Sequence, residues 1–184
     1  MIIAENKLLN LFFMKRVYSQ RYIFMTAGLL IMIYFTSCNP TKKWKEMEEE
    51  EKLLIQNYLY DHDTLDFELK TSGLYYLDVE VGAGPQAETH DTAYMFYTMS
   101  YLSGTVFESN VGTDDTLIFP VNEGWLSVKG FDEAVTYMKE GGKSKFLLPS
   151  SLAFGSSGTY NIASYTPFLF DAELTKLIKY TGRK

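Results

Sequence analysis

The chain has 184 residues, of which 46% are hydrophobic and 16% aromatic, and its formal net charge is −6 at pH 7. This composition can bury a sizeable core, so it excludes a disordered chain, and the length predicts one domain with appendages. A single cysteine excludes a disulfide framework and a cysteine-rich zinc site.

An export signal is predicted over residues 1–37. Residues 22–35 form an uncharged apolar run that ends at a small Thr-Ser pair. The positive charges just before this run are Lys15, Arg16 and Arg21. Positive, apolar and small residues in this order are typical of a secretory signal peptide. The run is also shorter than the ~20 residues that a transmembrane helix needs.

The chain's one cysteine, Cys38, follows this signal directly. The stretch Phe35-Thr-Ser-Cys38 resembles a bacterial lipobox, in which the cysteine becomes the acylated first residue of the mature protein, although Phe35 is bulkier than the usual leucine. We therefore expect Cys38 to carry a lipid and to attach the protein to a membrane of the cell envelope, on its periplasmic or outer-membrane side. The alternatives are a buried free thiol and an uncleaved anchor helix.

Processing changes the start and the charge of the chain. Met14 opens a more conventional signal than Met1, because two basic residues follow it directly, so residues 1–13 are interpreted as a start-site artefact. Removal of residues 1–37 lowers the net charge from −6 to −9. Such a charge disfavours nucleic acid or an anionic membrane surface as a partner. Membrane attachment is therefore expected to come from the lipid.

A charged helix is predicted over residues 41–60, which are free of glycine and proline and rich in strong helix formers. One largely apolar flank is defined by spacings of three and four, at Trp44, Met47, Glu51, Leu54 and Tyr58. Residues 38–70 are interpreted as a lipidated N-terminus with a solvated spacer helix, because charge runs are usually solvated faces. The alternatives are a docking surface for a partner and an acidic sorting signal after the cysteine.

From residue 71 the pattern changes to strands and tight turns, so one domain is expected over residues 71–184. Strands are predicted at residues 74–81, 93–102, 105–108, 116–121, 143–149 and 168–178. Between them one helix is predicted from helical spacing, at Phe131, Ala134, Val135 and Met138, with Asp132 at its positive end. One short helix among mainly antiparallel strands predicts an α+β fold.

The sequence contains no pattern that is typical of a metal site or of an activated nucleophile. His62 and His90 lack the partners that a metal site needs. The sequence has no glycine-rich phosphate loop, no His-Glu-x-x-His motif, and no serine or cysteine nucleophile in a recognisable frame. We therefore expect neither a metal nor a cofactor.

Several short pieces of residues 71–178 follow one another in a specific order. They are Thr71-Ser-Gly-Leu-Tyr-Tyr76, Tyr97 with Ser103-Gly-Thr-Val-Phe-Glu-Ser109, Phe119-Pro-Val121, Val128-Lys-Gly-Phe131, Met138-Lys-Glu-Gly-Gly-Lys143, Leu152-Ala-Phe-Gly155 and Phe168-Leu-Phe-Asp-Ala-Glu-Leu174. In this order and spacing they resemble the FKBP-type peptidyl-prolyl isomerase family. The resemblance implies a bent antiparallel sheet wrapped around one short helix, with an apolar site between them.

Carried over position by position, the resemblance implies a pocket. Its catalytic residues would be Tyr97, Phe107, Glu108, Phe154 and Phe170, and its substrate-binding residues would be Phe119, Val128, Phe131 and Ile162. Phe107, Phe119 and Phe170 would form the walls and Phe131 the floor, while the backbone N–H of Val128 would hold a substrate carbonyl. Each residue alone could be ordinary core, because apolar residues in strands usually are. Their joint match favours a pocket.

This chain departs from the family pattern at several of these positions. Phe131 stands where most members carry a tryptophan floor, and Glu108 stands where the family has an aspartate paired with the tyrosine hydroxyl. Phe154 replaces a tyrosine that donates a hydrogen bond to a ligand carbonyl, and Ile162-Ala-Ser164 replaces Ile-Pro-Pro. A lost neutral hydrogen bond is worth about 0.5–1.5 kcal/mol, so these changes predict weakened catalysis.

Two classes of function follow from the resemblance. The first, which is favoured, is a lipid-anchored prolyl isomerase that assists the folding of exported proteins by accepting their proline-containing segments. The second is a catalytically degenerate module that binds a client or peptide through the same aromatic groove. A purely structural lipoprotein without a pocket is the third and least favoured class.

Overall fold

The computed structural model describes residues 40–126 and 128–182. The chain divides into two units, Met1–Lys43 and Trp44–Lys184, and the second unit holds the sheet and the pocket. The predicted export signal and Cys38 lie outside the described residues.

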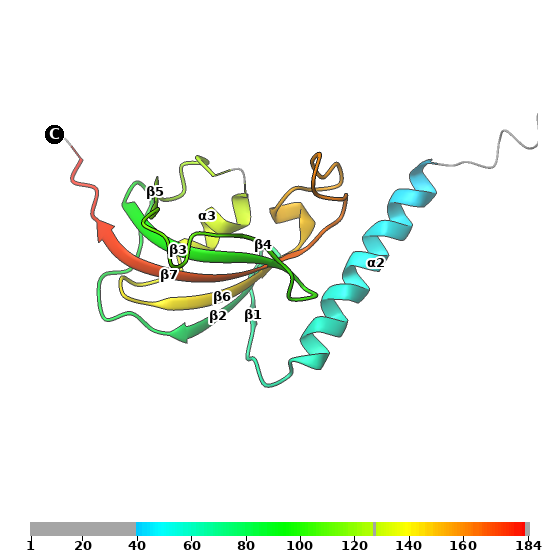
Figure 1. Cartoon of the computed structure of the whole chain (residues 1–184), viewed down its shortest axis with the longest axis horizontal. Coiled ribbons are helices and arrows are strands. Elements are labelled where there is room, and N and C mark those ends of the chain that lie inside the picture. The colour runs from blue at the N-terminus through cyan, green and yellow to red at the C-terminus, as the bar shows by residue number, and fades with distance from the viewer. Residues whose placement is uncertain (1–39, 127, 183–184) are drawn as a thin grey trace, which may run out of the picture. The chain divides into compact units, whose positions relative to one another are not determined.

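The described residues form two α-helices, a short 3-10 helix and seven strands (Figure 1). Their order is α2 (Pro40–Asp61), β1 (Glu68–Leu69), β2 (Tyr75–Glu80), β3 (Thr92–Tyr101), β4 (Val106–Ser109), β5 (Leu117–Pro120), α3 (Lys129–Val135), β6 (Lys143–Leu148), η1 (Ser150–Leu152) and β7 (Phe168–Ile178). Each predicted strand is present within two residues of its predicted bounds, and β1 was missed because it is only two residues long.

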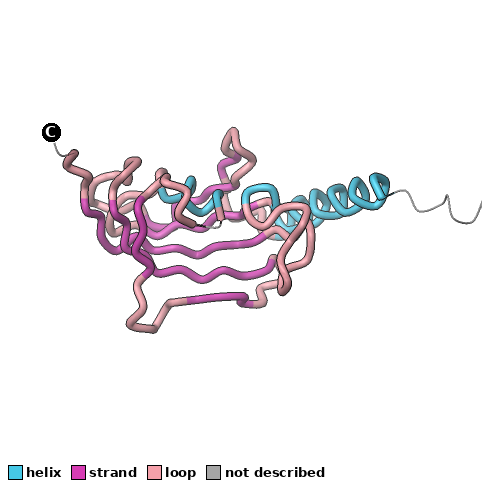
Figure 2. The backbone as a smooth tube through the Cα atoms, turned by 90° about the horizontal axis from the view of Figure 1, so that it is seen from above, coloured by secondary structure: helices cyan, strands magenta, loops and turns pink. Residues whose placement is uncertain are grey.

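All seven strands, magenta in Figure 2, belong to one antiparallel sheet. The order of neighbours is β1-β2-β6-β7-β3-β4. The long strand β3 pairs with β7 along one edge, and its other edge is shared by β5 and β4. A register shift between Tyr94 and Met95 breaks the β3–β7 ladder, and such a bulge bends a strand. The α+β fold with one short helix is thereby confirmed.

One face of the sheet packs against α3, which lies across it (Figure 1). Side chains that alternate along β3, such as Ala93, Met95 and Met99, point to this face and are buried, as the period of two in a strand requires. From α3, Phe131, Ala134 and Val135 complete the core. This packing brings the helix close to the centre of the sheet.

The flank of helix α2 that spacing predicted is buried only in part. Trp44 and Leu54, which belong to it, are 57% and 49% exposed, whereas Glu51, which also belongs to it, is buried together with Ile55. Ile55 packs against Leu147 and Leu169, whose neighbours along β6 and β7 face α3, so it covers the opposite face of the sheet. Among the described helices, none combines the length and apolarity that crossing a membrane requires.

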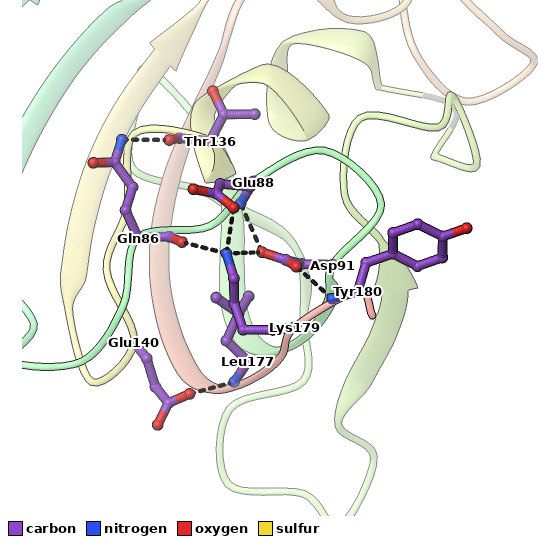
Figure 3. Close-up of polar contacts among 8 residues, drawn as sticks. All are labelled: Gln86, Glu88, Asp91, Thr136, Glu140, Leu177, Lys179 and Tyr180. Carbon is purple, nitrogen blue, oxygen red and sulfur yellow. Dashed lines mark hydrogen bonds and ion pairs between the residues drawn. The ribbon is translucent and has the colours of Figure 1, made fainter. Parts of the chain in front are cut away.

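The end of β7 is fastened to the segment before β3 by a buried carboxylate (Figure 3). Asp91 accepts hydrogen bonds from Lys179 Nζ at 2.7 Å and from the backbone N–H groups of Tyr180 at 2.8 Å and Glu88 at 2.9 Å. Burial alone would raise the pKa of Asp91, but these three donors outweigh it and hold that pKa below its ordinary value.

Candidate active site

A cavity of about 360 Å³ opens between α3, the strands β3, β4, β5 and β7, and the loop that joins β6 to β7. Its lining residues are Tyr97, Met99, Phe107, Glu108, Leu117, Leu126, Val128, Phe131, Phe154, Thr159, Asn161, Ile162 and Phe170. The lining is mainly apolar and aromatic, with few polar groups, as is usual for a site that binds a small apolar ligand.

The floor of the cavity is Phe131, the third residue of α3, which is 3% exposed. Its ring centroid lies 5.2 Å from that of Phe170 and 5.5 Å from that of Tyr97, in tilted and edge-on geometries that aromatic pairs prefer. Gly130 allows α3 to lie close to the end of β6, because a Cβ at this position would lie 2.7 Å from a side-chain atom of Leu148. This close approach of the helix places the next residue, Phe131, at the floor of the cavity.

One polar pair faces the cavity. The hydroxyl of Tyr97 donates a hydrogen bond to Glu108 Oε1 at 2.7 Å, so the longer side chain at this position still reaches its tyrosine. Burial, and then the bond to Glu108, raise the pKa of Tyr97 well above its ordinary value. The tyrosine is therefore protonated at neutral pH, and its proton is directed at the carboxylate.

A bulge in β4 aims Phe107 at the cavity mouth. Glu108 pairs with Met99 and Val106 pairs with the next residue, Ser100, so Phe107 is the extra residue between them. Its ring packs against Tyr101 at 5.9 Å and Phe168 at 5.8 Å between centroids, and it is 36% exposed. Phe107 is thus a half-open wall of the cavity.

The opposite wall comes from the loop of residues 149–167. Phe154 packs edge-on against Phe168, with 5.6 Å between ring centroids, and Ile162 is 4% exposed. The backbone N–H of Thr159 donates to the carbonyl of Ile162 at 2.8 Å, which closes the loop tip. Gly158, at φ +60, makes this turn possible, because a Cβ there would lie 2.2 Å from the same carbonyl oxygen.

Two polar side chains outside the cavity hold its walls. The amide of Asn110 accepts from the backbone N–H of Tyr97 at 2.7 Å and donates to Met95 O at 3.1 Å. The carboxylate of Asp132 accepts from the backbone N–H groups of Asn122 at 2.6 Å and Gly124 at 3.0 Å. Asp132 thus fixes the turn that precedes the lining residues Leu126 and Val128.

Of the nine predicted site residues, eight line the cavity, and their proposed roles stay predictions. Phe119 does not line it. It shares a strand face with the lining residue Leu117, but it lies two residues further along β5, where it is 1% exposed and packs behind Phe131 at 6.0 Å. Phe119 therefore supports the floor and is not a wall.

The sequence analysis missed five lining residues: Met99, Leu117, Leu126, Thr159 and Asn161. Met99 and Leu117 had a usable signal, because each is two residues from a predicted site residue in the same strand. The other three lie in loops, which have no periodicity to follow. Within the described residues, no three histidine, cysteine or acidic side chains group as a metal site would require.

Comparisons with known proteins agree with this geometry. The family model described as "FKBP-type peptidyl-prolyl cis-trans isomerase" matches residues 84–175, half of the chain. The chain is 35% identical over 108 residues to the FKBP-type peptidyl-prolyl cis-trans isomerase FkpA of Aeromonas hydrophila, an alignment that covers 59% of this chain and 39% of that protein. It is 33% identical to the chloroplastic isomerase FKBP16-3 of Arabidopsis thaliana, over 56% of this chain and 48% of that one.

Solved structures show the same fold. The crystal structure of FkpA from Escherichia coli superposes with a TM-score of 0.64 at 22% identity, covering 84% of this chain and 71% of that chain. The crystal structure of AtFKBP13 gives a TM-score of 0.56 at 28% identity, covering 60% and 98%. The chain matches less than half the length of the two curated relatives named above.

Proposed function

The chain belongs to the FKBP-type peptidyl-prolyl cis-trans isomerase family, and we propose that it is a lipid-anchored isomerase, with weakened turnover, that assists the folding of exported proteins. One observation carries the isomerase proposal: Tyr97, Phe131 and Phe170 meet in one aromatic cavity whose floor is almost fully buried. The substrates would be proline-containing segments of exported proteins.

An apolar cavity suits this reaction because of the electronic structure of the amide. Rotation about a peptide bond has a barrier of about 18–20 kcal/mol, since twisting removes the resonance. An unaided X-Pro bond therefore exchanges over tens of seconds or longer. The twisted transition state has lost the charge separation of the planar amide, so surroundings without water favour it over the ground state.

The residues of the cavity have separate parts in this mechanism. Phe131 and Phe170 would surround the proline ring and exclude water from the bond that twists. Val128, the N-cap residue just before α3, would offer its backbone N–H to a substrate carbonyl. The Tyr97 hydroxyl donates a hydrogen bond to Glu108, and this bond would hold these two polar side chains of the cavity in one arrangement.

Weakened turnover is proposed from Phe154. This side chain lines the cavity at the position where the family pattern has a tyrosine that donates to the ligand carbonyl, and a phenyl ring has no such donor. Loss of one neutral hydrogen bond worth about 0.5–1.5 kcal/mol slows a reaction by about two- to tenfold. This is compatible with an active enzyme.

Export and anchoring are proposed from the sequence order of positive, apolar and small residues before Cys38. The lipid would place the pocket in the cell envelope, where newly exported chains fold. The net charge of −9 that remains after processing gives no attraction to an anionic bilayer, so the lipid would be the anchor.

The isomerase proposal is tested with a protein whose refolding is limited by an X-Pro bond. The mature chain should accelerate the slow refolding phase in proportion to its concentration, and Phe170→Ala should reduce this effect when compared at equal folded fraction. The matched control is Phe96→Ala, which removes a phenylalanine from the opposite face of the sheet, outside the cavity. Equal loss with both variants would argue against a reaction in this cavity.

Phe154 also supports the alternative function, a module that binds peptides without turnover. A pocket that lacks the tyrosine hydroxyl at this position can still hold an apolar ring. This alternative predicts that wild type does not accelerate refolding but binds a proline-rich peptide, and that Phe170→Ala abolishes this binding while Phe96→Ala does not. That pattern would replace the isomerase proposal.

A further inference from the structure

A buried carboxylate of helix α2 contacts the loop that forms one wall of the pocket. Glu51 is 8% exposed, and its two oxygens accept hydrogen bonds from the backbone N–H and, at 2.7 Å, from the hydroxyl of Ser150. The two residues are 99 positions apart in the sequence. A buried carboxylate is costly unless it is hydrogen-bonded, so this contact ties α2 to the segment that follows β6.

Ser150 lies at the start of the wall loop, defined as residues 149–167. Its carbonyl accepts from the backbone N–H groups of Ala153 at 2.9 Å and Gly155 at 2.7 Å. The carbonyl of Gly155 then accepts from the backbone N–H of Tyr165 at 3.1 Å. A continuous series of hydrogen bonds thus leads from Glu51 through Ser150 to both ends of the wall loop.

Phe154 lies inside the turn that these bonds close. Ala153 and Gly155, its two neighbours, both donate to the carbonyl of Ser150, so the backbone at Phe154 can shift little while Ser150 is held. Its ring lines the cavity and packs against Phe168. The position of this pocket wall therefore depends on the position of Ser150.

Helix α2 also lies near the other end of the wall loop. The two are separated by a small cavity lined by Met47, Glu50, Glu51, Leu54, Ser164 and Tyr165. Ile55, one turn after Glu51, packs on Leu147 and Leu169, which belong to the strands just before and after the loop. Helix α2 thus bonds to the start of the wall loop and packs on the strands that flank it.

We propose that Glu51 is a positioning residue of the pocket: through Ser150 it fixes the wall loop and so sets the affinity for proline-containing segments. The proposal rests on the proposed function only for the identity of the ligand. Without Glu51, the backbone N–H of Ser150 has lost its acceptor and the loop samples more conformations. A ligand must then order the loop as it binds. The apparent Kd becomes the intrinsic Kd divided by the fraction of molecules whose loop is in the binding-competent conformation.

The test uses Glu51→Met in the full chain. Methionine keeps the length and the helix propensity but has no carboxylate oxygen to accept either hydrogen bond from Ser150. Its control is Glu49→Met, which removes the same charge from an exposed position of the same helix, where the described residues give its side chain an ion pair with exposed Lys52. The probe is a short peptide with an apolar residue before proline, and the readouts are its Kd, the KM and kcat for its isomerisation, and amide hydrogen exchange.

If Glu51 positions the wall loop, Glu51→Met should raise Kd and KM about tenfold, the change expected when the competent population falls to about one tenth, and leave kcat unchanged. Exchange at the amides of Gly155 and Tyr165 should accelerate, while exchange in β3 stays as in wild type. Ser150→Ala, which removes the hydroxyl but retains the backbone donor, should give a smaller change in the same direction. Adding it to Glu51→Met should have little further effect, because both variants act on one contact. Glu49→Met should match wild type.

Unchanged Kd together with unchanged exchange at Gly155 in folded Glu51→Met would overturn the proposal. So would a fall in kcat at constant KM, because a looser loop is expected to alter occupancy. If Glu51→Met does not fold, Ser150→Ala decides the question by the same readouts. If wild type has no turnover, the isomerase proposal fails, while Kd and hydrogen exchange still test the role of Glu51.

Discussion

Tyr97 and Glu108, on the neighbouring strands β3 and β4, are joined by a hydrogen bond of 2.7 Å that faces the pocket. The family pattern predicts an aspartate in place of Glu108, whose side chain is longer by one methylene. A bulge at Phe107 shifts the register of β4 against β3 just beside Glu108, and the longer side chain still accepts from the tyrosine. The pair therefore survives the substitution.

Alkaline titration provides a first prediction. Burial, and then hydrogen bonds that include Asp78 and Glu108, raise the pKa values of Tyr76 and Tyr97 above the ordinary value near 10.0. The unfolded chain loses these protons at a lower pH than the folded chain, so stability should be complete below about pH 10 and fall above it. Tyr97→Phe should flatten this fall in the free energy of unfolding, measured by urea denaturation. The control Tyr160→Phe, at a fully exposed position, should not.

The first prediction has a spectroscopic check. Phenolate absorbance of the folded chain should show tyrosines that titrate late, Tyr76 and Tyr97 among them, and Tyr97→Phe should remove one of these. Titration of Tyr97 at its ordinary pKa would contradict its burial and its hydrogen bond to Glu108.

Sequence periodicity predicted the regular elements of this molecule, its helices and strands. Helical spacing placed Phe131 on the apolar side of the predicted helix, while the family resemblance implied that Phe131 and Phe170 line one pocket, and the structure brings their rings together. Thr159 and Asn161 lie in a loop whose shape depends on distant hydrogen bonds, so no local pattern indicates them. The predicted flank of α2 is buried only in part: it included Glu51, which is buried and bonded to Ser150, but apolar spacing also favoured Trp44, which is 57% exposed.

Acid stability provides a second prediction, on the cluster in Figure 3. Because the pKa of Asp91 is held below its ordinary value, its contribution to stability should be complete above about pH 4 and be lost as pH falls through its folded-state pKa. Asp91→Asn should reduce the free energy of unfolding at pH 7 by about 1–3 kcal/mol, since it weakens several bonds to one buried group. Glu88→Gln, at a 73% exposed side chain that also pairs with Lys179, should change it little. Equal effects of the two variants in urea denaturation would contradict this account.

A third prediction is that residues 71–184 fold without α2. The main core cluster, which begins at Leu74, contains no residue of the helix, and Ile55 joins only a small cluster on the other face. The truncated chain should unfold cooperatively in urea but be less stable, because burying an isoleucine is worth about 1.5–3 kcal/mol. A molten or aggregating fragment would show that α2 belongs to the folding unit.

Lipidation is a fourth prediction, on a residue outside the described part of the chain. Metabolic labelling with a fatty acid analogue should mark the wild-type protein in a bacterium with an intact lipoprotein pathway, and Cys38→Ser should be unmarked. Both should be produced in similar amounts, because the substitution leaves the positive and apolar regions unchanged. Unlabelled wild type would remove the basis for membrane anchoring.

The fifth prediction asks whether the missing donor at Phe154 limits turnover. The ring of Phe154 lines the pocket and contacts Phe168 edge-on, so a hydroxyl added to the ring can be aimed at a bound carbonyl. Phe154→Tyr should raise the rate of proline-limited refolding by about two- to tenfold, the worth of one neutral hydrogen bond. Phe96→Tyr, which adds the same hydroxyl on the opposite face of the sheet, should leave the rate unchanged. If wild type is no faster than the spontaneous reaction and Phe154→Tyr does not change this, desolvation by the phenylalanines is insufficient for catalysis. The pocket would then serve binding alone, and Phe170→Ala should abolish peptide binding without any effect on refolding rates.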